Sequence, residues 1–586
     1  MYYIPAIRQL ILSIFFLSLT ACGGGGGSSP STQATYYVDS TEGNDNNSGT
    51  DSSTPWQTLE KLNSTTFSPG TIIRLKRGET WYEQLTISDS DITIDAYGTG
   101  DLPVIDGSIE VSGWTDLGGN IYSKTVTILS GEEGLGNISE NGSLLTFREW
   151  FISDSDTLSA APTGSFTYDF FNDTIYIKTG SDPSLNTYRA SRKYYGINTE
   201  DTSNISVKNV QVQRFSLNGI DFADCDNCKA RSVVSKDGGG TVIAVFNPYS
   251  GYLYAGNGIE YNNSCTNGFV EDVAVSNIFD SCISPQTFVS NQKASGFIFK
   301  NSTLDKCGFA GIEVSVLSNG GTTGSTLDNV SISGMTITNS GKGWSGRRYG
   351  TEGHGIRVRA DTGAGTMSGV SISRSTIESS AGDGIYIGGA SDIVTLDRLL
   401  INNNDIYGIE VIEPEATTLR VDMSSSLIHD NVNYGFTYNV PNGAGFNIYQ
   451  NSFYNNGAIN FAVFGQSGIA DMRNNIFHSS SAMTHIFVNV ILTEGTIDFN
   501  CYEDGLNMIG YDGSAYSTLA DFNSATSYEA SGDGSGFISF SSAGTGNFTL
   551  QADSSCKTLG STSTGISEDY TGNTFAMPPS SGAYQF

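Results

Sequence analysis

The sequence predicts an all-β solenoid, a stack of similar coils, and three observations carry this prediction. A phrase of Gly-Ile followed by alternating outward and inward residues recurs through the middle of the chain. Each copy follows a short run such as Ser331-Ile332-Ser333 and then a turn rich in Asn or Asp. One such unit cannot bury its apolar side alone, so neighbouring units must stack. The copies begin at Gly219, Gly258, Cys282, Gly311, Gly355, Gly384, Gly408 and Gly435.

The first 21 residues predict a signal peptide. Arg8 precedes an apolar run, Leu10 to Leu17, that is too short to span a bilayer. The run ends in Leu19-Thr20-Ala21-Cys22, which resembles the lipobox of bacterial lipoproteins and implies that Cys22 carries a lipid. Residues 22–34 form a tether rich in Gly and Ser. We therefore expect an exported protein, anchored through Cys22 to the outer membrane or cell surface. The alternative is an ordinary signal peptide in which Cys22 is incidental.

Residues 35–107 predict an N-terminal cap and the first coils. A strand starts at Tyr36, and Thr54 to Leu62 predicts a capped helix with Pro55 in its first turn. Such a helix would cover the open end of the stack. This block resembles the N-terminal region of right-handed parallel β-helix polysaccharide lyases and glycoside hydrolases, including the pectate-lyase-like enzymes. The resemblance implies a right-handed parallel β-helix with an N-terminal capping helix.

The rest of the chain divides into three parts. Residues 108–195 break the repeat with aromatic residues among turns, which predicts a small β insertion. The coils resume and run through residues 196–510, the central part that holds the predicted groove. Residues 511–586 are expected to form the last coils and a cap. Their end resembles the closing segment of the same β-helix proteins, in which a last strand covers the stack.

Charge and cysteine content limit the function and the partners. Asp and Glu outnumber Lys and Arg by 60 to 29, and the net charge of −31 argues against nucleic acid or an anionic membrane surface as a partner. We expect a monomer, with contact to a membrane only through the lipid at Cys22. Seven cysteines follow Cys22, so at least one stays free unless chains are cross-linked. Cys225 and Cys228 suit a local disulfide, although buried structural cysteines on adjacent coils are favoured.

Alternation along each strand predicts which residues lie side by side. Within each copy the Ile points inward, so the next residue points outward, and stacking aligns these positions in a row. We call this the outward row: Asp221, Glu260, Ser284, Glu313, Arg357, Tyr386, Glu410 and Thr437. A second row, the residues just before the Gly, includes Asn257, Ala310, His354, Asp383 and Tyr407. Charged residues in these rows indicate a functional surface, although a pair such as Glu313 and Arg357 can also be purely structural.

Two insertions flank the middle of the outward row. They span residues 246–256 and 340–353, and Glu260, Glu313 and Arg357 would form the floor between them. Five Lys or Arg fall between Lys342 and Arg359, which predicts a negatively charged guest, an acidic polysaccharide, unless the loop is only a solvated one. The predicted substrate-binding residues are Tyr249, Tyr252, Tyr254, Glu260, Lys342, Trp344, Arg347, Arg348, Tyr349, Arg359 and Glu410.

These residues fit a polysaccharide lyase that works by β-elimination. Such an enzyme needs a cation to neutralise the uronate carboxylate, a base to take a proton and an acid for the leaving oxygen. Arg357 and Arg359 are the predicted cations. His354, oriented by Asp383, is the predicted base. Tyr386 or Tyr349 is the predicted acid.

Two other functions stay open. An inverting glycoside hydrolase would use paired carboxylates, either Glu313 with Asp383 or Glu260 with Glu313. Gly353-His354-Gly355 resembles a motif of β-helix polygalacturonases, but the Asp pair and the Arg-Ile-Lys of that family are absent. The third function is glycan binding without catalysis. Calcium at Glu313 is a further expectation, because lyases of this architecture, by resemblance, often use it.

Overall fold

The computed structural model describes most of the chain. The described residues are 2–3, 33–127, 134–148, 158–170, 172–247, 251–317, 324–345, 352–361, 363, 365–389, 392–413, 419–440, 443–465, 467–479, 484–492, 494–503 and 508–585. Within them, no helix is long and apolar enough to cross a membrane. The expected lipidation site, Cys22, lies outside this part of the chain, and so do the signal peptide and tether, apart from Tyr2–Tyr3 and the last two tether residues.

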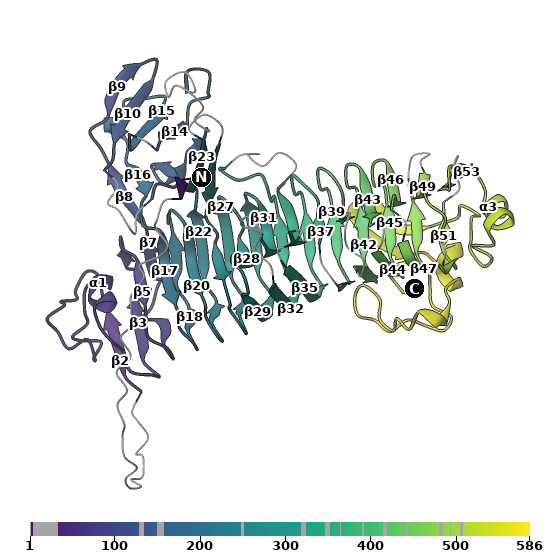
Figure 1. The fold of residues 1–586 in the computed structure, drawn as a ribbon, viewed down its shortest axis with the longest axis horizontal. Helices are drawn as coiled ribbons and strands as arrows, with labels where there is room; N and C mark the ends of the chain where they lie inside the picture. The colour runs from purple at the N-terminus through teal and green to yellow at the C-terminus, as the bar shows by residue number, and fades with distance from the viewer. Residues whose placement is uncertain are drawn as a thin grey trace, which may run out of the picture.

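The central body is a right-handed parallel β-helix made of three long sheets, which confirms the predicted fold class (Figure 1). The first sheet carries the Gly-Ile repeats. Its strands, in order, are β5 (Leu85–Ile87), β17 (Tyr195–Glu200), β20 (Asn218–Ala223), β25 (Ile259–Asn262), β28 (Ile283–Thr287), β31 (Ala310–Val316), β34 (His354–Ala360), β37 (Ile385–Gly388), β40 (Ile409–Ile412), β43 (Tyr434–Asn439), β46 (Ile459–Val463), β49 (Thr484–Val488), β52 (Ile509–Tyr511) and the antiparallel β53 (Ser514–Tyr516).

The second sheet contains the short Ser-Ile-Ser runs. Its strands are β2 (Thr35–Val38), β3 (Ile72–Lys76), β6 (Thr93–Tyr97), β18 (Ser206–Lys208), β21 (Lys229–Arg231), β26 (Phe269–Glu271), β29 (Lys293–Lys300), β32 (Ser325–Ser333), β35 (Gly365–Ser373), β38 (Ile393–Asp397), β41 (Arg420–Ser424), β44 (Gly443–Tyr449), β47 (Ser467–Arg473) and β50 (Glu494–Asp498).

The third sheet completes each coil with short strands. They are β4 (Thr80–Trp81), β7 (Val104–Asp106), β19 (Gln211–Gln213), β22 (Val234–Gly238), β27 (Ala274–Ile278), β30 (Thr303–Cys307), β33 (Thr336–Thr338), β36 (Thr376–Glu378), β39 (Leu400–Asn402), β42 (Leu427–His429), β45 (Ser452–Tyr454), β48 (Ile476–His478) and β51 (Cys501–Tyr502).

Sequence chemistry explains why these coils stack in register. The Ile of each Gly-Ile pair is fully buried, as at Ile312, Ile356 and Ile385. Asn at the turns between sheets adopts the left-handed conformation, for example Asn339 at φ 55°. Other Asn side chains, fully buried, form hydrogen-bonded ladders from coil to coil: Asn404 donates to Asn431 at 2.8 Å, and Asn431 to Asn456 at 2.9 Å. These ladders satisfy amide groups that would otherwise be buried without partners.

Helices cover both ends of the stack. The N-terminal helix α1 (Leu59–Asn63) buries Leu59 and Leu62, which confirms the capping helix, but it begins later than the predicted Thr54. Thr58 caps it by accepting a hydrogen bond from Lys61, while Trp56 pairs with the backbone of Tyr37. At the other end α3 (Leu519–Thr526) buries Leu519 and Phe522 in the main core.

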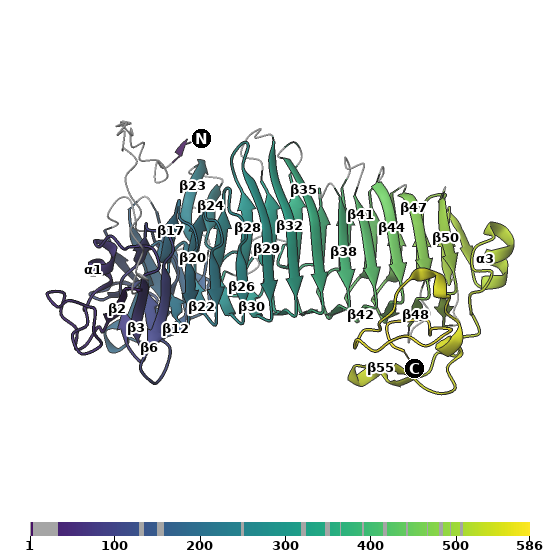
Figure 2. The same cartoon turned by 90° about the horizontal axis from the view of Figure 1, so that it is seen from below.

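The C-terminal segment differs from the expected strand cap. It contains the hairpin of β54 (Phe540–Ser542) and β55 (Asn547–Leu550) and then runs back along the flank of earlier coils (Figure 2). The backbone N–H of Ala583 donates to Ser452 at 2.9 Å, and Ser425 donates to the carbonyl of Glu568 at 2.8 Å. The stack therefore ends in a helix, because α3 supplies the apolar side chains that close it.

Residues 108–195 form the predicted small β insertion. One sheet contains β9 (Thr115–Gly118), β10 (Ile121–Thr125), β13 (Thr146–Phe147), β14 (Ser165–Asp169) and β15 (Thr174–Lys178); the other contains β8 (Ser108–Val111), β11 (Ile138–Glu140), β12 (Ser143–Leu144) and β16 (Tyr188–Ser191). The insertion stands over the N-terminal coils, next to the hairpin of β23 (Thr241–Asn247) and β24 (Gly251–Ala255) (Figure 1). Tyr2–Tyr3, β1, pairs with β23.

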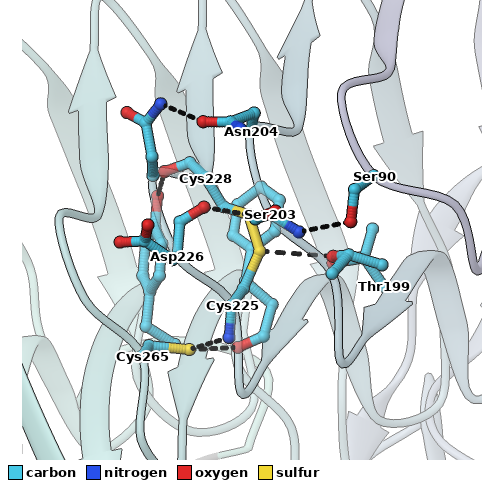
Figure 3. The surroundings of a disulfide bond; sticks show 12 residues. Ser90, Thr199, Ser203, Asn204, Cys225, Asp226, Cys228 and Cys265 are labelled. Atoms are coloured by element: carbon cyan, nitrogen blue, oxygen red, sulfur yellow. Dashed lines mark hydrogen bonds between the residues drawn. A yellow bond between two sulfur atoms is a disulfide. The ribbon is translucent and has the colours of Figure 1, made fainter. Parts of the chain in front are cut away.

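The cysteines are structural. Disulfides join Cys225 to Cys228, Cys282 to Cys307, and Cys501 to Cys556. The free thiol expected from the odd number is Cys265, which is buried beside the first disulfide (Figure 3). Its sulfur accepts a hydrogen bond from the backbone N–H of Cys225 at 3.2 Å, and burial raises the pKa of the thiol.

Candidate active site

The register of the first sheet brings the outward row together as predicted. Asp221 pairs with Glu260, Glu260 with Ser284, Glu313 with Arg357, Arg357 with Tyr386, and Tyr386 with Glu410. His354 pairs with Ala310 at the start of its strand. Residues separated by scores of positions are thus neighbours on one face, and the chemistry of that face follows from their contacts.

His354 is held between two carboxylates. Its Nε2 lies 2.8 Å from Oε2 of Glu352, and its Nδ1 lies 3.2 Å from Oδ2 of Asp383. Burial alone lowers the pKa of His354, but hydrogen bonds and charges from Asp383 and Glu352 outweigh burial and raise the pKa to about 9. The backbone N–H of Asp383 donates to Nδ1 at 3.2 Å. The raised pKa means that His354 holds its proton more tightly than a free imidazole, so this environment does not favour His354 as a base.

Glu313 and Arg357 form a buried ion pair. Nη1 of Arg357 donates to Oε1 of Glu313 at 2.9 Å, and both side chains are almost completely buried. Ser281 and Ser315 also donate to Glu313, at 3.0 and 2.9 Å. The Arg357 guanidinium stacks over the ring of Phe309, with its central carbon 4.9 Å from the ring centre. Because Nη1 of Arg357 and the Glu313 carboxylate bind each other inside the fold, these two residues form the support of the site.

Tyr386 and Glu410 are the half-buried members of the outward row. The ring of Tyr386 stacks on the ring of His354, with the centres 4.9 Å apart. Burial raises the pKa of Glu410 to about 7, and the negative charge of Asp383 adds to the effect while His354 opposes it. Oδ1 of Asp383 accepts a hydrogen bond from the backbone N–H of Tyr407 at 3.0 Å. A carboxyl group that holds a proton near neutral pH therefore lies beside one that faces an imidazolium.

The N-terminal half of the outward row is sealed. Glu260 is 1% exposed, and burial, with the charge of Asp221, raises its pKa well above the usual value. Burial also raises the pKa of Asp221 to about 7. Asn257 donates to Glu260, and Asn218 donates to Asp221 at 2.6 Å. The predicted groove floor at Glu260, Glu313 and Arg357 is therefore buried, and substrate binding by Glu260 is not supported.

Two of the predicted substrate-binding residues, Trp344 and Tyr254, have a structural role instead. Trp344 and Tyr254 are buried in the core that joins the insertion to the coils, together with Phe166 and Phe279. The indole N–H of Trp344 donates to the carbonyl of Asn277 at 2.9 Å. These buried rings hold the insertion against the coils, which does not support the predicted substrate binding by Trp344 and Tyr254.

The predicted cations are paired or lie outside the described residues. Lys342 lies 3.2 Å from Asp405, and Arg359, with 38% of its side chain exposed, lies 2.8 Å from Asp361. The predicted residues Arg347, Arg348, Tyr349 and Tyr249, and the side chain of Tyr252, lie outside the described part of the chain.

Sequence reasoning missed several neighbours of the site. Glu352 contacts His354, and Oε2 of Glu352 also lies 3.8 Å from Nε of Arg357. Bonding to His354, with charges from the two arginines nearby, outweighs burial and lowers the pKa of Glu352. The sequence signal that could have identified Glu352 is its position just before Gly353-His354. Phe309, which lies under Arg357, gave no signal, because it precedes a repeat strand without belonging to either row.

The surroundings of Glu313 do not suit the expected calcium ion. Its oxygens accept bonds from Ser281, Ser315 and a guanidinium, and the positive charge of Arg357 disfavours a cation there. Across the residues that the structure describes, no group of three or more His, Cys, Asp or Glu is arranged to hold a metal. No step proposed below uses a metal.

Comparison with known proteins agrees with the fold. Residues 354–521 match the family described as the right-handed β-helix region. No curated protein matches the chain. The solved complex of XylC with xylose is 14% identical, with a TM-score of 0.50, covering 80% of this chain and 84% of that chain. Pectate lyase Pel9A is 14% identical, with a TM-score of 0.39, covering 94% and 96%.

A third similar structure is the A-module of the mannuronan C-5 epimerase AlgE6 from Azotobacter vinelandii. It is 11% identical, with a TM-score of 0.32, covering 75% of this chain and 85% of that chain. At these identities the likeness concerns the fold alone, a right-handed parallel β-helix.

Proposed function

We propose that the protein is a glycoside hydrolase in which Glu410 is the general acid and Asp383 is the nucleophile. One observation carries the proposal: the carboxyl group of Glu410, whose pKa is raised to about 7, is hydrogen-bonded to that of Asp383, which lies 3.2 Å from Nδ1 of His354. Glycosidic cleavage requires a carboxyl group that donates a proton next to a second carboxyl group.

The reaction runs in two displacements. Glu410 donates its proton to the glycosidic oxygen while a carboxylate oxygen of Asp383 bonds to the anomeric carbon and the leaving group departs. A glycosyl ester of Asp383 forms. The Glu410 carboxylate then takes a proton from water, and the water oxygen displaces Asp383. The residues belong to adjacent coils and their carboxyl groups are hydrogen-bonded to each other, so a substrate that enters between them would open the pair toward the about 5 to 5.5 Å of retaining enzymes.

His354 and Glu352 act as positioning residues in this mechanism. Nδ1 of His354 lies 3.2 Å from Oδ2 of Asp383, and the Tyr407 N–H donates to Oδ1, so the carboxylate is fixed in orientation. Glu352 in turn holds the imidazole from its other nitrogen. The Asp383 side chain is 2% exposed, so a substrate reaches it only after the hydrogen bond between Asp383 and Glu410 opens.

β-Elimination on an acidic polysaccharide is the second candidate, and Arg359 favours it. This side chain is partly exposed. Burial raises the pKa of the Tyr386 hydroxyl, the acid expected for a lyase, and the positive charge of Arg359 opposes this effect in part. Arg357 gives less support, because its guanidinium is buried against Glu313. Binding without catalysis would leave the glycan intact.

Product analysis separates these functions. The purified protein is incubated with xylan, polygalacturonate, alginate and chondroitin, and reducing ends are counted while absorbance is followed at about 235 nm. Hydrolysis predicts reducing ends without ultraviolet absorbance; absorbance would show elimination and contradict the proposal. Glu410→Gln should remove the activity, and Glu378→Gln, on the third sheet, serves as the matched control. Activity that survives Glu410→Gln would also contradict it.

We also propose that the mature protein is lipid-anchored at Cys22, which rests on the lipobox resemblance. In a bacterial host, labelled palmitate should enter the wild-type protein, and Cys22→Ser should lose both label and membrane association. An unlabelled wild-type protein would contradict this.

A further inference from the structure

A row of aromatic side chains continues the outward face beyond the proposed catalytic pair. We call Tyr407, Tyr434, Phe464 and Phe487 the aromatic row. The rings of Tyr407 and Tyr434 are parallel within 1°, with centres 5.2 Å apart. Phe464 follows at 6.0 Å from Tyr434, and Phe487 at 5.7 Å from Phe464. Phe464 is 37% exposed, and the other three are half-buried.

The aromatic row is joined directly to the proposed site. The backbone of Tyr407 donates to Asp383, and Glu410 lies one coil from Thr437 on the same face. Tyr434 lies in β43 and Phe487 in β49, while Phe464 directly follows β46. These three strands lie side by side along the long axis of the molecule (Figure 1). Phe487 pairs with Gly510 on the next coil, where a Cβ atom would come within 2.8 Å of the ring. The missing side chain at Gly510 thus leaves room for the last ring.

Charge on this part of the chain excludes a strongly anionic ligand. Between Leu399 and Asp512 the only Lys or Arg are Arg420 and Arg473. Both lie on the second sheet, and each is paired with a carboxylate, Asp422 or Asp471. Three acidic residues lie in the segment that follows Tyr407 in the sequence: Glu410, Glu413 and Glu415. Lys342, from an earlier part of the chain, lies 3.2 Å from Asp405, two residues before Tyr407. Because this cation and both arginines are already paired with carboxylates, electrostatics disfavours a polyuronate along the row.

We infer that the aromatic row binds a neutral stretch of a glycan chain that lies along the axis of the β-helix. This inference depends on the proposed hydrolase function in one respect only: the cleaved bond is placed at Glu410. Sugar rings have apolar C–H faces and polar edges, and this surface offers both kinds of contact. Phe464, tilted by 42° from Tyr434, presents an apolar face, while the stacked tyrosines leave their edges to a ligand.

The test measures binding separately from turnover. Calorimetry is performed with Glu410→Gln protein, which prevents cleavage, and with xylohexaose, cellohexaose, mannohexaose and hexagalacturonate as probes. Phe464→Ala and Tyr434→Ala are each added to this background. Ile469→Ala, which removes an exposed apolar side chain from the second sheet, is the control. A melting curve for each protein checks that the coils are intact.

We expect at least one neutral hexamer to bind, with affinity falling on the order of tenfold in Phe464→Ala and in Tyr434→Ala and unchanged in Ile469→Ala. Equal affinity in all variants, tighter binding of hexagalacturonate than of every neutral probe, or no binding of a neutral probe would overturn the inference. Ring-dependent binding by a protein that hydrolyses nothing would overturn the hydrolase proposal and keep this one. Hydrolysis that is unchanged when the rings are removed would keep the hydrolase proposal and overturn the inference about the aromatic row.

Discussion

The two halves of the outward row share one repeat and one register but have opposite environments. In the N-terminal half, Asp221, Glu260 and Glu313 are buried and bonded to Asn, Ser and Arg side chains. In the C-terminal half, Tyr386 and Glu410 are half-buried and lead to the aromatic row. The insertion stands over the first half, near β23 (Figure 1). The comparison teaches that alternation decides which way a side chain points, whereas distant segments decide whether it reaches solvent.

The largest effect expected from this contrast concerns two glutamates in the same row. Glu410→Gln should lower kcat by about 10²- to 10⁴-fold, because the general acid is lost. Glu260→Gln should leave kcat within about twofold, since that side chain is 1% exposed and an amide of similar shape replaces the carboxyl group. Steady-state kinetics on the same substrate compares them. Equal losses in both variants would mean that the sealed half also takes part in catalysis.

Stability should distinguish the two arginines of β34. Arg357→Met leaves the buried Glu313 unpaired and should reduce the free energy of unfolding by about 3 to 5 kcal/mol. Arg359→Met breaks a partly exposed pair with Asp361 and should cost less than about 1 kcal/mol. Urea denaturation at neutral pH measures both. Similar losses would contradict the assignment of Arg357 as the support of the site.

A smaller effect should appear in the dependence of stability on pH. The pKa of His354 is raised from 6.5 to about 9 in the folded protein, so its contribution is complete below about pH 6.5 and is lost as pH rises through 9. The contribution is on the order of 3 kcal/mol. The difference in unfolding free energy between wild type and His354→Gln should therefore shrink from pH 6 to pH 9.5. A constant difference over this range would show that His354 is neutral in the fold.

The sequence was sufficient for the fold and for the neighbours within each row. Both follow from local periodicity: Ile312, Ile356 and Ile385 specify the inward face, so Glu313, Arg357 and Tyr386 must be adjacent outside. Whether a given side chain is exposed to solvent could not be predicted from this periodicity. Trp344 lies in a loop rich in Gly and Arg, yet it packs against Phe166 of the insertion, far away in sequence.

The roles of Asp383 and Glu410 could be assigned only from the three-dimensional structure. Asp383 and Glu410 were both named from the sequence, but as parts of different roles. Their relation depends on His354, on Glu352 and on burial together, and Glu352 falls outside the strand register that sequence periodicity describes. The C-terminal cap was mispredicted for a related reason: Leu519 and Phe522 bury against the last coils, whereas the expected closing segment follows the flank.

The configuration of the first product tests the central claim, that Asp383 and Glu410 are the catalytic pair, most directly. Proton NMR during the first minutes of cleavage identifies the anomer before mutarotation. Double displacement through Asp383 predicts that the product keeps the configuration of the substrate. An inverted product would contradict the account, because it would require a carboxylate that activates water and not one that bonds to the anomeric carbon.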